Sequence, residues 1–165
     1  MIKVGITGSI ASGKTTVARI FSSRKYPLFD ADREVKKIYK TNYFKKKVFS
    51  KFNLENKKNI KGKIKKLLSI DKNSLKSIER IIHPIVRKNL IKFVKKNKKE
   101  KFLIFEIPLL IESKLMKNFN KVIFVNSSKK IRMRRFLNRG KNRKIFDVLD
   151  KRQLQPAKKI KFCDY

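Results

Sequence analysis

A glycine-rich segment near the start of the chain has the residue types and spacing of a phosphate-binding loop. Residues 8–15, GSIASGKT, fit the pattern G-x-x-x-x-G-K-[ST]. Glycines permit a tight turn in which backbone N–H groups converge on phosphate oxygens, and a helix that starts there adds the positive end of its dipole. Lys14 can reach the terminal phosphates, and the Thr15 hydroxyl can bind Mg²⁺. An apolar run before the loop and helical spacing after it favour a triphosphate site over an incidental glycine turn.

Carboxylates follow two further apolar runs. Asp30 and Asp32 end the segment YPLFDAD, while Glu106 and Glu112 flank the segment IPLLI. In open α/β folds ligands bind at the carboxyl ends of the strands, where a carboxylate can accept the proton of a hydroxyl that attacks a phosphate. Asp30 or Asp32 could instead cap the next helix, and spacing alone leaves both roles open for both residues. Glu106 is either an acid near Mg²⁺ or a structural hydrogen-bond acceptor.

Basic residues and a single histidine complete the candidate chemistry. Arginines on a mobile turn can close over ATP and stabilise charge on the transferred phosphoryl group, although several must lie on an exposed helix face. The cluster near the turn NRGKNR comprises Arg132, Arg134, Arg135, Arg139 and Arg143. His83 precedes Pro84 on an apolar helix, which favours a packed or capping role. With no second histidine and only one cysteine, a zinc site or a Cys-His nucleophile is not supported.

Short apolar runs that alternate with helical segments position these residues. The predicted strands cover residues 1–7, 26–30, 102–106 and 121–128. This alternation predicts a parallel sheet with helices on both faces, an α/β fold. Asn126 or Ser127 is expected to cap the next helix, Pro156 to mark a break near the end of a helix over 145–154, and residues 160–165 to begin a further strand. The apolar positions expected to face the core from four of the helices are Val17, Ile20, Phe21, Val35, Ile38, Tyr39, Ile131, Met133, Phe136 and Leu137.

A basic helical section separates the second and third predicted strands. Residues 43–99 contain no convincing strand and are too long for one crossover helix, so they predict a helical insertion whose most loop-like part is 56–62. The strongest apolar face consists of Ile81, Ile82, Ile85, Val86, Leu90 and Val94. We therefore expect a nucleotide-binding core made of 1–41 and 100–165, interrupted by an inserted domain at 42–99.

Length and charge restrict the class of protein. A chain of 165 residues predicts one globular domain, and 47 Lys+Arg against 12 Asp+Glu give a net charge of +35. The lysines are scattered, as at Lys65-Lys66, and are interrupted by apolar residues at helical spacing, which indicates solvated helix faces; nucleic acid is not specifically expected as a partner. Cys163 is the single cysteine, which fits a reducing cytosol, and neither a membrane span nor an export signal is visible. We expect a cytoplasmic protein that does not bind membranes.

The motifs in this order resemble the dephospho-CoA kinase family of P-loop kinases. The resemblance rests on GITGSIASGKTTVA, LFDAD, IIHPIV, IPLLIES and VIFVNSSKKIRMRRFLNR, and it runs collinearly along essentially the whole chain. It implies transfer of the γ-phosphate of ATP to the ribose 3′-hydroxyl of dephospho-CoA, the last step of coenzyme A biosynthesis, with Mg²⁺ as cofactor. The implied fold has three layers with a five-stranded parallel sheet, an acceptor-binding domain at 42–99 and a lid at 139–146.

The resemblance also implies roles for individual residues. Asp32 is the expected general base, and Lys14 and Arg139 are expected to offset the negative charge that develops on the phosphoryl group. The residues implied to hold the ATP phosphates are Gly8, Ala11, Ser12, Gly13, Lys14, Thr15 and Thr16, with Thr15 as the metal ligand. Those implied to bind the acceptor are Asp30, Asp32, Lys36, His83 and Glu112.

The sequence departs from the family pattern at several positions. Ser9 and Ala11 stand where the family usually has glycines, and Lys36 replaces a common arginine, which loses bidentate phosphate contacts. The family continues past Tyr165, so we expect either a fragment or a shortened enzyme; a monomer is favoured. A kinase for another small acceptor, such as a nucleoside monophosphate, is the main alternative. A basic nucleic-acid-binding protein with a relic loop is the second.

Overall fold

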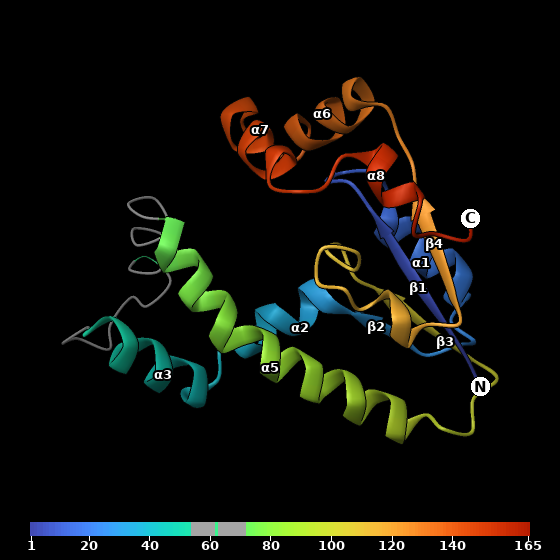
Figure 1. The fold of residues 1–165 in the computed structure, drawn as a ribbon, viewed down its shortest axis with the longest axis horizontal. Helices are drawn as coiled ribbons and strands as arrows, with labels where there is room; N and C mark the ends of the chain where they lie inside the picture. The colour runs from blue at the N-terminus through green and yellow to red at the C-terminus, as the bar shows by residue number, and fades with distance from the viewer. Residues whose placement is uncertain (54–61, 63–71) are drawn as a thin grey trace. The chain divides into compact units, whose positions relative to one another are not determined.

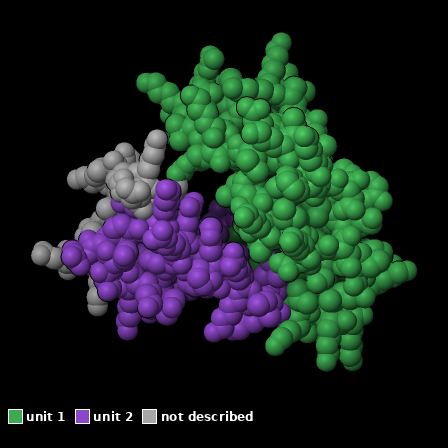
Figure 2. All heavy atoms as spheres, in the orientation of Figure 1, with its two compact units in different colours: residues 1–31, 94–165 green, residues 32–93 purple. Residues whose placement is uncertain are grey.

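The computed structural model describes residues 1–53, 62 and 72–165 (Figure 1). Contacts between residues divide the chain into two units, one made of residues 1–31 and 94–165 and the other of residues 32–93. Figure 2 shows the first unit in green and the second in purple. The first unit contains the β-sheet and the second is helical. The predicted loop at 56–62, except Gly62, and the Lys65-Lys66 cluster lie outside the described residues.

A parallel sheet of four strands forms the centre of the first unit. The strands are β1 (Ile2–Gly8), β2 (Leu28–Asp30), β3 (Phe102–Glu106) and β4 (Lys121–Val125), in the spatial order β2-β3-β1-β4. All three neighbouring pairs are parallel, so the four carboxyl ends lie along one edge. β3 is buried from Leu103 through Glu106, as expected of a strand covered on both faces.

Helices connect the strands and supply the rest of both units. They are α1 (Lys14–Ser22), α2 (Ala31–Ile38), α3 (Asn42–Phe52), α5 (Lys72–Lys96), α6 (Lys129–Leu137), α7 (Arg143–Lys151) and α8 (Pro156–Ile160), with a short 3-10 helix η1 at Met116–Asn118. In the first unit, Ala18 of α1 packs with apolar side chains of β1 and β3. Phe136 of α6 and Phe146 of α7 form a separate cluster with Ala11. Among the described residues, none of the helices combines the length and the apolar character that crossing a membrane requires.

The second unit has a core of its own. Its buried members are Ile38, Phe44, Val48, Ile78 and Ile82. Thr41 caps α3 by accepting a hydrogen bond from the backbone N–H of Phe44 at 3.2 Å. The ring of Tyr39 packs edge-on against Phe44, and burial, reinforced by the Glu79 carboxylate, raises the pKa of the Tyr39 hydroxyl. The predicted core positions Val35, Ile38 and Tyr39 are therefore confirmed.

The prediction of a five-stranded sheet is wrong for the described part of the chain. Residues 156–160 form α8, and 161–162 make a turn. Asp164 and Tyr165 alone reach the edge of β4: the N–H of Asp164 donates to Val122 O at 2.8 Å, and the N–H of Phe124 donates to Tyr165 O at 2.7 Å. Two paired residues do not make a strand, so the final segment begins sheet pairing without adding a fifth member.

The buried face of α1 also differs from the prediction. Ile20 and Phe21 are 66% and 48% exposed, whereas Ala18 and Ser22, one turn apart, are buried. Small side chains on this face let the helix lie close to the sheet. Val17, the third predicted position, does pack against the core of the sheet. The apolar spacing therefore identified the helix and one residue of its buried face, but Ile20 and Phe21 were assigned to that face wrongly.

Helix boundaries near the C-terminus differ by a few residues from those expected. Ser128, rather than Asn126 or Ser127, caps α6 by accepting from the N–H of Ile131. α7 ends before Pro156, as expected, at Lys151 rather than near residue 154. Pro156 also begins α8, because proline fits the first turn of a helix, where its missing N–H costs no hydrogen bond.

The second unit covers residues 32–93, whereas the insertion expected from the sequence covers 42–99. The second unit begins at residue 32, because α2 packs into the helical core rather than onto the sheet. Asn89 of α5 donates to the Glu34 carboxylate of α2 at 3.2 Å, which adds a polar contact between these two helices. The expected acceptor-binding role of this region stays a prediction.

Candidate phosphate-binding site

The P-loop, residues 8–15, connects the end of β1 to the start of α1. Gly8 adopts a φ of 153°, and a Cβ built there would lie 2.5 Å from the carbonyl oxygen of Val125 and 2.8 Å from Ser12 Oγ. The first of these neighbours is backbone and cannot give way easily. Only glycine therefore lets the loop leave β1 so close to the end of β4.

Ala11 lies in the left-handed region with a φ of 57°. For an L-residue this conformation costs about 1–2 kcal/mol. Its methyl group, however, packs into the apolar cluster with Phe136 and Phe146, where the two rings lie edge-on. Burial of the methyl offsets part of the strain, which explains how alanine can stand at this turn.

Lys14 and the start of α1 place positive charge at the P-loop. Lys14 Nζ donates a hydrogen bond of 2.8 Å to the carbonyl oxygen of Ser9, and the residue is only 8% exposed. The N–H of Val17 bonds to the Gly13 carbonyl as the first regular turn of the helix. N–H groups that precede this turn have no acceptor within a helix, so together with the helix dipole they favour an anion at this end.

Thr15 and Glu106 meet at the carboxyl edge of the sheet. The Thr15 hydroxyl donates to Glu106 Oε1 at 2.6 Å, and Glu106 is buried. In the sheet register Glu106 lies opposite Asp30 at the end of β2 and Ile6 of β1. The site therefore combines a hydroxyl with two neighbouring strand-end carboxyl groups.

This donor set fits a hard divalent cation. Hydroxyl and carboxylate oxygens are ligands that Mg²⁺ prefers, and Mg²⁺ usually binds through few protein groups, with water and phosphate completing its shell. Within the described ranges no three His, Cys, Asp or Glu side chains cluster as a complete metal site. The protein side of a cation site would consist of Thr15 with Glu106 beside it.

Two arginines of α6 contact the P-loop. Arg135 Nη1 donates to the carbonyl oxygen of Ser12 at 3.0 Å, and the buried Arg132 donates to that of Ile10 at 3.4 Å. Arg139, singled out from the sequence, is exposed beyond the end of α6. Sequence reasoning found the arginine cluster but not these two contacts. Their i, i+3 spacing on one helix was the available signal.

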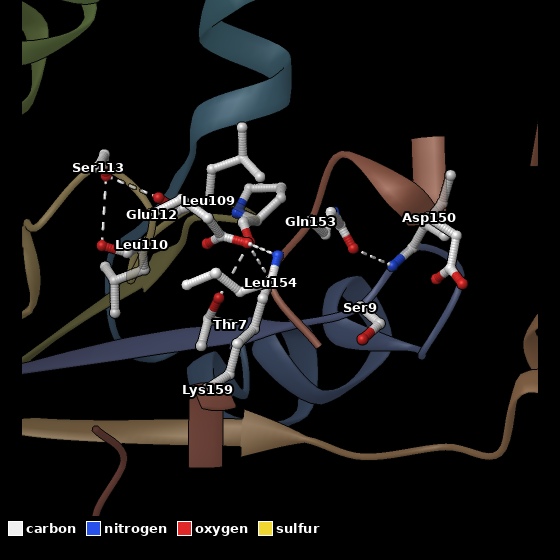
Figure 3. Close-up of polar contacts among 12 residues, drawn as sticks. Thr7, Ser9, Leu109, Leu110, Glu112, Ser113, Asp150, Gln153, Leu154 and Lys159 are labelled. Atoms are coloured by element: carbon white, nitrogen blue, oxygen red, sulfur yellow. Dashed lines mark hydrogen bonds and ion pairs between the residues drawn. The ribbon is translucent and has the colours of Figure 1, made fainter. Parts of the chain in front are cut away.

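The remaining candidates lie in different surroundings. Asp32 and Lys36 are exposed on α2, and His83 is exposed on α5 rather than packed, so the packed role predicted for this histidine is wrong. All three belong to the second unit. Glu112 belongs to the first unit, where it contacts Leu154 and Lys159 (Figure 3).

Comparisons with known proteins agree on one family. The family model described as Dephospho-CoA kinase matches residues 2–165. The chain is 34% identical over 166 residues to a dephospho-CoA kinase of Fusobacterium nucleatum, covering 98% of this chain and 86% of that protein. It is 33% identical over 166 residues to one from Rickettsia typhi, covering 100% and 86%.

Two solved structures are similar to the chain over nearly its whole length, and one of them is a dephospho-CoA kinase. A dephospho-CoA kinase from Campylobacter jejuni has a TM-score of 0.68 at 27% identity, covering 99% of this chain and 85% of that one. A crystal structure of a protein from Thermus thermophilus has a TM-score of 0.82 at 27% identity, covering 98% and 85%. The likeness thus extends over the sheet, the P-loop and the residues around it.

Proposed function

This chain belongs to the dephospho-CoA kinase family, and we propose on that basis which of its residues carry out the reaction. The activity is the ATP-dependent phosphorylation of the ribose 3′-hydroxyl of dephospho-CoA, which yields coenzyme A and ADP and completes coenzyme A biosynthesis. In such a transfer the protein contributes mainly positioning and charge stabilisation. The observation that carries the proposal is the P-loop at the end of β1 with Thr15 bonded to Glu106.

The P-loop residues bind the phosphates of ATP in this proposal. The backbone N–H groups at the start of α1 and the Lys14 ammonium hold the phosphate oxygens, and Lys14 exchanges its bond to Ser9 O for one to phosphate. The proposed set is Gly8, Ala11, Ser12, Gly13, Lys14, Thr15 and Thr16. Arg139, in a lid at residues 139–146, adds positive charge over the transferred group.

Magnesium is the proposed metal cofactor, with Thr15 as its protein ligand. The hydroxyl of Thr15 and the carboxylate of Glu106 fit the preference of Mg²⁺ for oxygen. When bound, Mg²⁺ neutralises charge on the β- and γ-phosphates. Thr15 keeps its oxygen at the carboxyl edge of the sheet because it lies in the first turn of α1 and bonds to Glu106.

The acceptor side of the proposal rests on the acids after β2. Asp32, exposed in the first turn of α2, accepts the proton of the attacking 3′-hydroxyl, while Asp30 contributes to acceptor binding. Lys36, His83 and Glu112 complete the proposed acceptor-binding set, and residues 42–99 form the acceptor domain. We also propose a cytoplasmic location, because a single cysteine fits a reducing compartment, and we propose that the protein is a monomer.

A panel of acceptors tests the assignment. Purified protein with Mg-ATP is offered dephospho-CoA, AMP, CMP or shikimate, and release of ADP is followed. We expect dephospho-CoA to stimulate ADP release strongly and the other three to leave it near the rate without acceptor. Lys14→Ala should abolish the stimulated rate, because a phosphate contact made through charge is lost. Stimulation only by another acceptor would replace the assignment with a kinase for that acceptor.

A further inference from the structure

The bridging segment, residues 150–160, runs from the end of α7 through α8. It contacts two separate loops of the first unit. Figure 3 shows neighbouring residues Gln153 and Leu154 with polar contacts in opposite directions. Gln153 Oε1 accepts a 2.8 Å hydrogen bond from the backbone N–H of Ile10 in the P-loop. The N–H of Leu154 donates at 3.1 Å to Glu112 in the loop that follows β3. The segment therefore bridges two loops at the carboxyl edge of the sheet.

The P-loop is held at both polar groups of Ile10. Gln153 accepts from its N–H, and Arg132 Nη1 donates to its carbonyl oxygen at 3.4 Å. Arg132 is itself oriented by an ion pair with Asp150 and by a hydrogen bond from its Nε to Ser127 O at 3.2 Å. Rotation of the peptides on either side of Ile10 would break at least one of these bonds.

The other end of the bridging segment is anchored by an ion pair between a buried lysine and a partly exposed glutamate. Lys159 of α8 is fully buried, and its Nζ lies 2.7 Å from Glu112 Oε1. The same carboxylate oxygen accepts the N–H of Leu154. Removal of one member of a buried ion pair leaves the other uncompensated, so the pair resists separation. Gln153, next to Leu154, is thereby held at a defined distance from the P-loop.

Ile10, whose N–H and carbonyl oxygen are both held, directly precedes Ala11, whose backbone is strained. Ala11, with its φ of 57°, follows Ile10 and leads into Ser12 and the start of α1. Strained backbone persists only where the surroundings over-determine it. The two bonds to Ile10 supply such a constraint from one side, and the packing of the Ala11 methyl supplies one from the other.

We propose that Gln153 is a positioning residue for ATP, because it holds the Ile10 peptide and so keeps the strained turn at Ala11 in the conformation that binds phosphate. Gln153 does not touch the phosphates in this proposal; its carbonyl group acts through the P-loop backbone. The inference rests on the proposed role of the P-loop as the ATP-phosphate site. It adds that the affinity for ATP depends on the side chain of Gln153, which lies 143 positions after Ile10 in the chain.

The test replaces the acceptor atom and measures ATP binding directly. Gln153→Met keeps the length of the side chain but removes the oxygen that accepts the Ile10 N–H. Titration with a fluorescent ATP analogue, without any acceptor substrate, should show a dissociation constant raised roughly five- to tenfold, the loss expected for one hydrogen bond. In steady-state assays KM for ATP should rise, while KM for dephospho-CoA stays as in the wild type.

Further variants separate positioning from simple loss of fold. Gln153→Glu keeps an oxygen acceptor and should restore most of the ATP affinity. Gln155→Met is the matched control, since Gln155 is exposed and its side chain does not cap α8. Gln153→Met should also be measured in an Ala11→Gly background. There the fold-increase in the dissociation constant for ATP should be less than half of that seen with Ala11 present, because glycine adopts positive φ without strain. If Gln153→Met does not fold, Gln153→Asn, which draws the acceptor back by one methylene, takes its place.

The outcomes distinguish this inference from the assigned reaction. Unchanged ATP affinity in Gln153→Met overturns the inference, whatever the acceptor panel shows. Equal losses of affinity in the wild-type and Ala11→Gly backgrounds, with no restoration by Gln153→Glu, also overturn it and leave a purely structural role. If wild-type protein binds ATP but does not phosphorylate dephospho-CoA, the assigned reaction fails, and weaker ATP binding by Gln153→Met still supports the inference.

Discussion

Thr15 joins two parts of the chain that lie 91 residues apart, since its hydroxyl donates to Glu106 at the end of β3. The contact links the helix that begins at the P-loop to the strand beside β1. The sequence left two roles open for Glu106, a structural hydrogen-bond acceptor or an acid near Mg²⁺. The carboxylate is a structural acceptor here, and it also lies beside Thr15, the proposed magnesium ligand. One residue can serve in both ways, because each carboxylate oxygen offers two acceptor positions.

Substitution of Gly8 tests the steric argument at the same scale. Gly8→Ala should lower the free energy of unfolding by roughly 1–3 kcal/mol, because the added methyl meets the backbone oxygen of Val125 at 2.5 Å. Thermal or denaturant unfolding measures the change. Gly140→Ala is the control: its φ of 69° is also positive, but the new methyl meets no atom within 4 Å. Equal losses for both variants would contradict the steric argument and leave only backbone strain.

Kinetic measurements can distinguish the proposed roles of Asp32 and Asp30. Asp32→Asn should lower kcat about 10²- to 10⁴-fold, the usual contribution of a general base, and leave ATP binding intact. Asp30→Asn should act mainly on KM for dephospho-CoA, since its proposed role is to bind the acceptor. Steady-state kinetics with varied dephospho-CoA, together with ATP titration, measure both effects. Near-normal kcat in Asp32→Asn would remove it as the base.

At the scale of elements, the carboxylate of Asp164 helps to hold the final residues against the edge of β4. Asp164 Oδ2 accepts the N–H of Val122 at 2.8 Å, and Oδ1 lies 3.3 Å from Lys121 Nζ. The hydrogen bond from Val122, and then the one from Lys121, lower the pKa of the Asp164 carboxyl. The last residues of the chain are thus tied to the sheet by a side chain as well as by backbone.

This lowered pKa predicts a specific dependence of stability on pH. Because the carboxyl pKa is lower in the folded state, its ionisation stabilises the fold above the unfolded-state pKa of about 3.9, and this contribution is lost as pH falls through the folded-state value. The difference in unfolding free energy between wild type and Asp164→Asn should therefore shrink as pH falls from neutral to below about 3. Denaturant unfolding across that range measures it. A difference that stays constant with pH would show that the Asp164 charge does not matter.

For the whole molecule, the dominant property is the net charge of +35. Both substrates are polyanions, so the field of the protein should raise the rate at which they meet it. Added salt from about 0.01 M to about 1 M shortens the screening length from about 30 Å to about 3 Å. We expect kcat/KM for dephospho-CoA to fall over this range while kcat at saturation changes little. An uncharged cosolute at matched viscosity is the control, and kcat/KM that is insensitive to salt would exclude steering.

The sequence by itself determined the P-loop, all four strands and the family. The P-loop is contiguous, its chemistry depends on local spacing, and buried parallel strands are continuous apolar runs, so these features need no distant partner. It failed at Ile20 and Phe21 of α1, which are exposed, and at the fifth strand. Both depend on how segments pack rather than on their own periodicity.

Only the tertiary structure decided which distant groups meet at the phosphate site and at the loop beside it. The bonds of Thr15 to Glu106, of Ile10 to Gln153 and of Glu112 to Lys159 each join residues far apart in the chain. Their partners follow from the strand order β2-β3-β1-β4 and from the path of α6, α7 and α8, which single-sequence patterns do not encode. The physical reason is that a hydrogen bond or an ion pair depends on distance in space, whereas a motif records only distance along the chain.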